Sequence, residues 1–317
     1  MPVLTHRDVP YPATLIFNAG VCKYAGRYVM VFRNDFGRWG DTAFDGTNLG
    51  VAFSDDGVRW AVGPQPVWDQ TDPALQAAAG GGVLRVYDPR LSVIDGRPYV
   101  CFACDTHYGL RGDVAAVADD FRSFRVLSLS VPDNRNMVLF PERVGGRYVR
   151  LERPMLGYYL RSSRFDVWAS CSPDLVHWGD TRLVLAAEQV PFSNDKIGPA
   201  APPVRTKRGW LTTFHAVDVD EARGKRGWES RWTKRYTAGL MLLDLDDPTR
   251  IIGLSRTPLL APELDFERHG FRDDVIFPGG MILEDSGEVK IYYGGADTVE
   301  CLATAHVDDL LALCEPW

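Results

Sequence analysis

Apolar and polar positions repeat in a fixed order along this chain. Five times an apolar, strand-like segment is followed by a short turn that contains Asp, at residues 53–57, 117–121, 171–175, 245–248 and 307–310. Upstream of each turn a glycine opens another strand-like segment, as at Gly26, Gly96 and Gly146. Five copies correspond to roughly 63 residues per unit, slightly above the usual length of one propeller blade. The pattern therefore predicts a ring of five blades.

Each unit opens with a segment that is apolar almost throughout, at residues 15–21, 86–91, 137–141, 196–200 and 275–280. Continuous apolarity is typical of an innermost strand that is packed on both faces. Turns such as Asp95-Gly96 and Gly145-Gly146 predict tight hairpins to the next strand. We expect an all-β fold, a five-bladed β-propeller formed by a single domain over residues 1–317, with the active site at the central shaft.

The ends of the repeat predict how the ring closes. The fifth unit runs out after Leu313, so we expect the segment around Val3 to supply the last strand. Two stretches do not follow the repeat: residues 64–85 lack a strand pattern, and residues 216–236 are rich in charge. Long loops on a rigid scaffold frequently carry function, and a solvated insertion is the alternative.

Several aromatic residues fall in the predicted loops, namely Trp39, Tyr108, Trp228, Trp232 and Tyr236. Such rings are suitable platforms for sugar rings, while ordinary packing is the alternative for each of them. We expect the loop at 216–236 to place Trp228, Trp232 or Tyr236 beside the mouth of the shaft.

Composition narrows the classes of partner. The chain carries a formal net charge of −7, which argues against a general nucleic-acid or anionic-membrane surface. No apolar run reaches membrane-spanning length, and the first residues lack the plan of a signal peptide, so we expect a cytoplasmic protein. Cys101 and Cys104 have no second pair at zinc-site spacing among the 6 cysteines, so we expect buried thiols and no metal.

Asp88 is the sharpest candidate for chemistry. It lies in an apolar strand between Tyr87 and Pro89, where burial is expected to raise the pKa of its carboxyl group and help it hold a proton. A carboxylic acid in a shaft that admits a sugar can protonate the leaving oxygen of a glycoside. The alternative is a structural ion pair with Arg90.

Four potential hydrogen-bond donors stand at the strand ends of neighbouring units: Arg135, Arg153, Lys196 and His215. Arg binds phosphate through a planar fork, and Lys binds it as a point charge. In a protein that is acidic overall, such a group predicts a site for a compact anion. Four separate structural cations are the alternative.

Longer strings of sequence resemble glycoside hydrolase family 130, the β-mannoside phosphorylases and their hydrolytic relatives. They lie in order along the chain, at residues 17–21, 87–90, 138–142, 150–154, 196–198, 213–215, 242–248 and 291–298. The resemblance implies a five-bladed propeller in which Asp88 is the catalytic acid. It also implies that Arg135, Arg153, Lys196 and His215 bind phosphate.

The resemblance further implies which residues contact sugar. They are Asn18, Arg33 and Asp297, to which we add Tyr236 and Asp274 as candidates. The implied reaction is inverting phosphorolysis of a β-mannoside, of the β-1,2, β-1,4 or mannosyl-glucose type, to α-D-mannose 1-phosphate and a shortened sugar. Inorganic phosphate would be a co-substrate, with no other cofactor, and a homo-oligomer is left open.

Two other functions remain open from the sequence. The first is a β-mannoside hydrolase on the same fold, in which Glu142, Asp274 or Asp297 activates water. The second is a carbohydrate-binding propeller without catalysis, which predicts that Arg90 covers Asp88 and that no anion pocket lies opposite.

Overall fold

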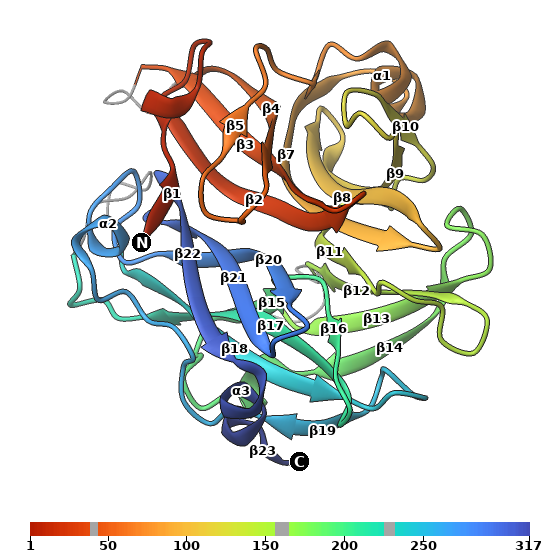
Figure 1. Cartoon of the computed structure of the whole chain (residues 1–317), viewed down its shortest axis with the longest axis vertical. Helices are drawn as coiled ribbons and strands as arrows, with labels where there is room; N and C mark the ends of the chain where they lie inside the picture. The colour runs from red at the N-terminus through yellow and green to blue at the C-terminus, as the bar shows by residue number, and fades with distance from the viewer. Residues whose placement is uncertain (39–43, 156–164, 225–231) are drawn as a thin grey trace.

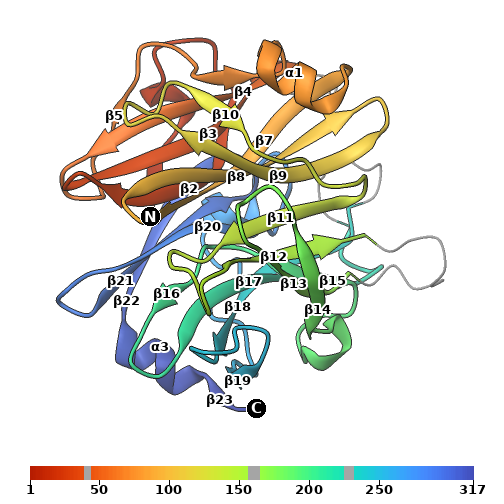
Figure 2. The ribbon, with the colours of Figure 1, turned by 90° about the vertical axis from the view of Figure 1, so that its right-hand side faces the viewer.

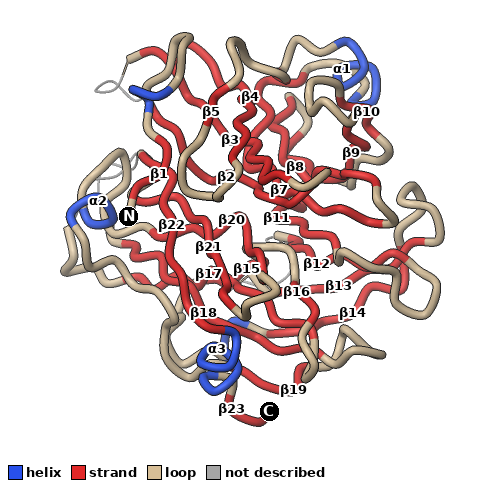
Figure 3. Tube along the Cα trace, in the orientation of Figure 1, coloured by secondary structure: helices blue, strands red, loops and turns tan. Residues whose placement is uncertain are grey.

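The structure, a computed structural model, describes residues 1–38, 44–155, 165–224 and 232–317. Its strands form five sheets that lie side by side in a ring (Figure 1). Strands dominate the ring, while the short helices lie at its periphery (Figure 3). The prediction of a five-bladed β-propeller is therefore confirmed.

The blades follow the chain in order. Blade 1 contains β2 (Leu15–Tyr24), β3 (Arg27–Gly37), β4 (Phe44–Ser54), β5 (Ala61–Val62) and β6 (Trp68–Asp69). Blade 2 contains β7 (Val83–Ile94), β8 (Arg97–Thr106), β9 (Gly109–Val117) and β10 (Phe124–Val126). Blade 3 contains β11 (Asn134–Leu139), β12 (Tyr148–Pro154), β13 (Val167–Ser172) and β14 (Gly179–Leu185).

The last two blades contain the chain ends. Blade 4 contains β15 (Lys196–Pro199), β16 (Val204–Arg205), β17 (Trp210–Val219), β18 (Lys234–Leu243), β19 (Ile251–Leu254) and β23 (Glu315–Pro316). Blade 5 contains β20 (Ile276–Leu283), β21 (Glu288–Gly295), β22 (Val299–His306) and β1 (Pro2–Leu4). The helical segments are α1 (Pro73–Ala79), α2 (Asp265–Arg268), α3 (Val307–Leu313) and two single 3₁₀ turns, His6–Asp8 and Ala187–Gln189. Figure 2 shows α1 and α3 at opposite ends of the molecule.

The ring closes as the sequence predicts. Strand β1 pairs antiparallel with β22, and Pro2 lies opposite Cys301. The N-terminal segment thus becomes the outermost strand of the blade that the C-terminal third of the chain builds (Figure 1).

Three local predictions were wrong. The fifth Asp turn, at 307–310, is the start of α3, because His306 caps the helix by accepting a hydrogen bond from the amide of Asp308. Residues 64–85 contain β6, α1 and the start of β7, and Asp72 caps α1. Strands β17 and β18 extend into the range 216–236, so its two ends, 216–219 and 234–236, belong to strands.

Apolar side chains fill the spaces between neighbouring blades. Between blades 1 and 2, the ring of Trp68 stacks on Phe124 with 4.7 Å between centroids. Cys101 and Cys104 are buried in β8, and the cysteines of the described residues are all free thiols, as expected. Within the described ranges, no helix has the length and apolarity needed to cross a bilayer.

Four of the five inner strands contain a bulge beside the shaft. The pairing register shifts between Phe17 and Gly20 in β2 and at the corresponding points of β7, β11 and β20. Asn18, Asp88 and Asn136 occupy three of these bulges with positive φ angles of 54°, 51° and 58°. Asn and Asp tolerate this left-handed conformation better than other residues with a Cβ. A bulge re-aims a side chain, and Asn18 and Asp88 are in this way turned into the cavity of the shaft.

Arg90 holds the inner strands together below these bulges. Its guanidinium donates hydrogen bonds to the carbonyl oxygens of Ala200, Asn18, Pro89 and Pro278, which belong to blades 4, 1, 2 and 5. The side chain is fully buried. Arg90 therefore serves the backbone, and the predicted alternative in which it pairs with and covers Asp88 was wrong.

Candidate active site

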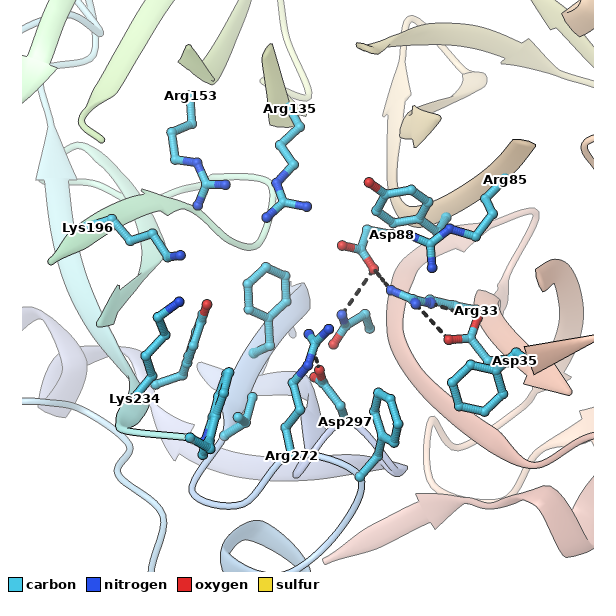
Figure 4. Close-up of a pocket in the computed structure, with 18 residues that line it drawn as sticks. Arg33, Asp35, Arg85, Asp88, Arg135, Arg153, Lys196, Lys234, Arg272 and Asp297 are labelled. Carbon is cyan, nitrogen blue, oxygen red and sulfur yellow. Dashed lines mark hydrogen bonds and ion pairs between the residues drawn. The ribbon is translucent and has the colours of Figure 1, made fainter. Parts of the chain in front are cut away.

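A cavity of about 430 Å³ opens at the end of the shaft where these bulges lie. This volume is within the usual range of small-molecule sites. The described side chains that line it are Asn18, Arg33, Asp35, Phe44, Arg85, Tyr87, Asp88, Arg135, Arg153, Lys196, Trp232, Lys234, Tyr236, Phe271, Arg272, Val275, Phe277 and Asp297. Every blade contributes to this set, as expected for a site on the axis of a propeller (Figure 4).

Asp88 reaches the cavity on the bulge of β7. Its Oδ1 accepts a hydrogen bond from Asn18 Nδ2 at 3.0 Å and one from Arg33 Nη1 at 3.3 Å. Arg33 also forms a close ion pair with Asp35, at 2.6 Å between Nη2 and Oδ2. The carboxylate of Asp88 is therefore fixed by two side chains of blade 1.

The predicted direction of the Asp88 pKa was wrong. Burial alone raises this pKa, but the positive charges of Arg33 and Arg90 and the hydrogen bond from Asn18 outweigh burial and lower it. Arg33 comes close because blades 1 and 2 meet at the shaft, whereas Arg90 lies two residues away on the same strand. The carboxyl group is consequently ionised at neutral pH before a substrate binds.

Three of the predicted anion-binding residues line the opposite part of the cavity. Figure 4 shows Arg135, Arg153 and Lys196 pointing into it from blades 3 and 4. Arg135 and Arg153 are direct neighbours across β11 and β12. Within the described part of the chain neither has a carboxylate partner, and Nε and Nη2 of the buried Arg153 make no hydrogen bond.

Without a bound anion, this group of positive charges destabilises the folded protein. Burial and the positive charge of Arg135 lower the pKa of Arg153 to about 9. Burial and the charge of Arg153 likewise lower the pKa of Lys196. Buried like charges repel one another and lose hydration, so an anion among them would relieve both penalties.

His215 lies behind this group and not in it. The side chain is fully buried in β17, does not line the cavity, and its Nε2 lies 3.0 Å from Nη1 of Arg153. Because Arg153 can only donate, His215 Nε2 accepts, and the imidazole is neutral. Burial and the charge of Arg153 lower its pKa well below the ordinary value. The structure thus places His215 where it orients Arg153.

The predicted sugar-binding residues divide into two groups. Asn18, Arg33, Asp297 and Tyr236 line the cavity. Asp297 is buried and forms an ion pair with Arg272, at 2.7 Å between Oδ2 and Nη1. Asp274 is buried but does not line the cavity, and its carbonyl oxygen accepts a hydrogen bond from the amide of Tyr236.

The loop aromatics are placed unequally. Trp232 and Tyr236 line the cavity and stack on each other with an interplanar angle of 3°. Tyr108 is 74% exposed and does not line the cavity. Trp39 and Trp228 lie outside the described residues.

Sequence reasoning missed several cavity residues, chiefly Arg85, Tyr87, Lys234 and Arg272. Lys234 could have been found, because side chains two apart on a strand share a face and Tyr236 was already a candidate. Arg85 binds Asp105, and Tyr87 donates a hydrogen bond to the same carboxylate. Arg272 lies in an irregular segment before β20, where no periodic pattern indicates direction.

One candidate base of the hydrolase hypothesis lies far from this chemistry. Glu142 pairs with Arg205 and lines a separate depression of about 330 Å³ with residues from the other ends of the inner strands. In the ranges that the structure covers, no group of three or more His, Cys, Asp or Glu side chains is placed to hold a metal ion.

Comparison with known proteins agrees with this geometry. The family model described as beta-1,4-mannooligosaccharide phosphorylase matches residues 3–316. The chain is 30% identical to the Beta-1,4-mannooligosaccharide phosphorylase of Ruminococcus albus over 98% of this chain and 88% of that protein. It is 29% identical to the 1,2-beta-oligomannan phosphorylase of Thermoanaerobacter sp. over 93% and 91% of the two chains.

A solved structure has the same fold. The Beta-1,2-Mannobiose phosphorylase of Listeria innocua superposes with a TM-score of 0.82 over 98% of this chain and 96% of that chain, at 23% sequence identity. With a family model that covers nearly the whole chain and a relative that is 30% identical along it, the protein belongs to glycoside hydrolase family 130.

Proposed function

We propose that this protein catalyses the inverting phosphorolysis of a β-mannoside, with inorganic phosphate as co-substrate, to α-D-mannose 1-phosphate and a shortened sugar. The observation that carries the proposal is the pair formed by the half-buried Arg135 and the buried Arg153, which face the same cavity as Asp88 without carboxylate partners in the described structure. The names of the family relatives support the reaction and the mannosyl group.

Asp88 is the proposed general acid. Its resting pKa is lowered, so it must gain a proton as the substrates bind. A phosphate dianion beside Arg135 adds negative charge, and a sugar excludes water, and both effects raise the pKa of a nearby carboxyl group. Asp88 then protonates the oxygen of the leaving sugar, either directly or through a hydroxyl group of the mannosyl residue.

Phosphate is the proposed nucleophile. Arg135, Arg153 and Lys196 would bind it, with His215 orienting Arg153 from behind. Phosphate is already an anion and attacks the anomeric carbon without a general base. Attack from the side opposite the leaving sugar inverts the configuration from β to α.

The remaining polar wall is the proposed mannosyl site. Asn18, Arg33 and Asp297 lie beside Asp88, and the pair Arg272–Asp297 fixes one carboxylate in this wall. Tyr236 and Trp232, on the side of Lys234, would face the leaving sugar. Candidates for that sugar are a mannose joined by a β-1,2 or β-1,4 linkage and a glucose.

Hydrolysis is the second candidate, because Asp297 shares the cavity with Asp88 and its pKa is raised chiefly by burial. A base in an inverting hydrolase must leave room for one water between two carboxyl groups. The cation group has no role in that reaction, which favours phosphorolysis.

The deciding experiment measures the rate of β-mannoside cleavage with and without phosphate. We expect turnover to depend on phosphate and to yield α-D-mannose 1-phosphate. Arg153→Ala should raise the phosphate concentration needed, and Asp88→Asn should lower kcat by roughly 10²–10⁴, the usual contribution of general acid catalysis. Asp55→Asn, in an exposed turn, is the matched control. Cleavage at full speed in phosphate-free buffer would establish the hydrolase instead.

A further inference from the structure

A network of buried side chains stands behind the two arginines of the anion group. Glu152 Oε2 accepts hydrogen bonds from Asn134 Nδ2 at 3.0 Å and from Arg150 Nη2 at 2.8 Å. Arg150 Nη1 binds Asp113 Oδ1 at 2.6 Å, and its Nε donates to Ser170 Oγ at 3.1 Å. None of these side chains lines the cavity. Any effect of these side chains on a bound ligand must therefore be transmitted through other residues.

The network joins the strand pair that carries the arginines. Asn134 and Glu152 stand one position before Arg135 in β11 and before Arg153 in β12. Side chains alternate along a strand, so Asn134 and Glu152 occupy the face opposite to the arginines. Their hydrogen bond crosses the strand pair directly behind the position where Arg135 and Arg153 face each other.

The backbone ladder is regular on only one side of this position. The register of β11 and β12 shifts between Arg135 and Val138, which interrupts the ladder there. On the other side the ladder continues, and the amide of Met155 donates a hydrogen bond to the carbonyl oxygen of Asp133 at 2.7 Å. Like charges directly opposite each other destabilise a strand pair. The bond between Asn134 and Glu152 therefore adds support to a strand pairing that the charges of Arg135 and Arg153 oppose.

The same network links two blades. Asp113 belongs to β9 of blade 2, the blade that carries Asp88, whereas Arg150 belongs to blade 3. The guanidinium of Arg150 also lies 4.1 Å from the ring of Trp178, which fixes its plane. This buried ion pair thus helps to set the position of the anion group relative to the acid, together with the apolar contacts between blades 2 and 3.

We propose that Glu152, held by Asn134 and Arg150, is a positioning residue for the phosphate site, and that the bond from Arg150 to Asp113 sets this site relative to Asp88. The proposal rests on the proposed function, since it takes phosphate to be the anion. Loss of the Asn134–Glu152 bond leaves both arginines present but lets their separation vary. Phosphate binding should then weaken while mannoside binding is spared.

The test compares Asn134→Ala and Glu152→Gln with wild type. We expect KM for phosphate and the phosphate dissociation constant from calorimetry to rise roughly 2- to 12-fold, the factor that corresponds to one ordinary hydrogen bond. KM for the mannoside should stay within about twofold, because Asn18, Arg33 and Asp297 are untouched. Glu284→Gln is the matched control, because Glu284 binds Lys23, Lys290 and Tyr28 in a network that lies outside the cavity.

The outcomes separate the two proposals. A purely structural role would lower the melting temperatures of Asn134→Ala and Glu152→Gln and leave both KM values near those of wild type, which would overturn the positioning role. Equal rises in both KM values would overturn it as well. A wild-type enzyme whose rate ignores phosphate would overturn the proposed function, and calorimetric titration with phosphate would still decide whether Asn134 and Glu152 shape the anion site.

Discussion

At the scale of single residues, charges that the fold brings together decide the properties of the site. Asp88 shows this most clearly, because burial would raise its pKa while Arg33 of blade 1, with Arg90 of its own strand, lowers it. Arg153 shows the converse, because Arg135 on the adjacent strand makes its charge more costly. Local sequence describes neither effect.

His215 provides a test at this scale through the pH dependence of stability. Burial and the charge of Arg153 keep its folded-state pKa well below 6.5, so below pH 6.5 the unfolded chain binds a proton that the folded protein does not. This group therefore lowers the free energy of unfolding as pH falls, by up to about 1.4 kcal/mol per pH unit. His215→Gln should remove that slope.

Urea unfolding of both proteins at pH 5, 6 and 7 measures the effect. The free-energy gap between wild type and His215→Gln should shrink toward pH 5. A gap that stays constant over this range would mean that His215 titrates normally in the folded protein.

The residue types of the site could be predicted from the sequence, but the directions in which their side chains point could not. An isolated Asp in an apolar strand and a group of cations at strand ends are visible in the sequence, and both reached the cavity. His215 and Asp274 did not: His215 lies behind Arg153, and Asp274 precedes β20 with a positive φ of 58°, where no strand alternation fixes the direction of its side chain. Arg272 was missed because it lies in an irregular segment before β20, and Lys234 was overlooked although it shares a strand face with Tyr236.

At the scale of elements, close approach between inner strands limits which residues they can contain. Gly279 lies at the bulge of β20, and a Cβ there would overlap the carbonyl oxygen of Ala19 in β2 and lie 3.2 Å from Nη1 of Arg90. A side chain at this point would separate blades 1 and 5 beside the shaft.

We therefore expect Gly279→Ala to lower the free energy of unfolding by about 1–3 kcal/mol, the usual cost of overpacking. Gly179→Ala is the matched control, because a Cβ there has no described atom within 4 Å. Denaturant unfolding of the two variants measures the difference. Equal stability would mean that blades 1 and 5 can separate at no cost.

The strands themselves follow from the sequence better than their interruptions do. Apolar runs and Gly-led hairpins identified the inner strands, because burial on both faces leaves a continuous pattern. The bulges at Asn18, Asp88 and Asn136 have no such pattern, because one additional residue changes the pairing and not the composition. Helix α3 was predicted as a turn because acidic residues favour both a turn and the first turn of a helix.

At the scale of the whole molecule, a buried carboxyl group sits where the ring closes. Glu300 of β22 accepts a hydrogen bond from the amide of Ala19 in β2 at 3.0 Å, and so joins blades 5 and 1. Burial raises its pKa to about 8, and within the described residues its Oε1 has no hydrogen-bond partner. Ionisation of Glu300 would therefore destabilise the contact that closes the ring between blades 5 and 1.

The protein is expected to lose stability at the ring closure as the pH rises. The unfolded chain loses this proton near pH 4.5 and the folded protein near pH 8, so the stability contributed by protonated Glu300 is complete below 4.5 and is lost as pH rises through 8. The shift corresponds to a change on the order of 5 kcal/mol. Glu300→Gln keeps an acceptor for the amide of Ala19 without a charge. The free energy of unfolding of this variant relative to that of wild type should therefore increase from pH 5 to pH 9.

Thermal or urea unfolding at these two pH values checks this prediction. Glu315→Gln, at a site 63% exposed, is the control and should follow wild type. A constant difference between wild type and Glu300→Gln would show that Glu300 is ionised in the closed ring at both pH values.

The pairing of β1 with β22 also has a consequence for synthesis. Residues 2–4 leave the ribosome before almost all of the strands, yet their partner at 299–306 comes near the end of the chain. At roughly 5–20 residues per second, the stretch between them takes roughly 15–60 s to make. During that interval blade 1 can fold, but its inner strand has no blade 5 to pack against. The nascent chain therefore exposes an apolar inner edge until residues 276–306 have been made, and chaperones have that interval in which to bind it.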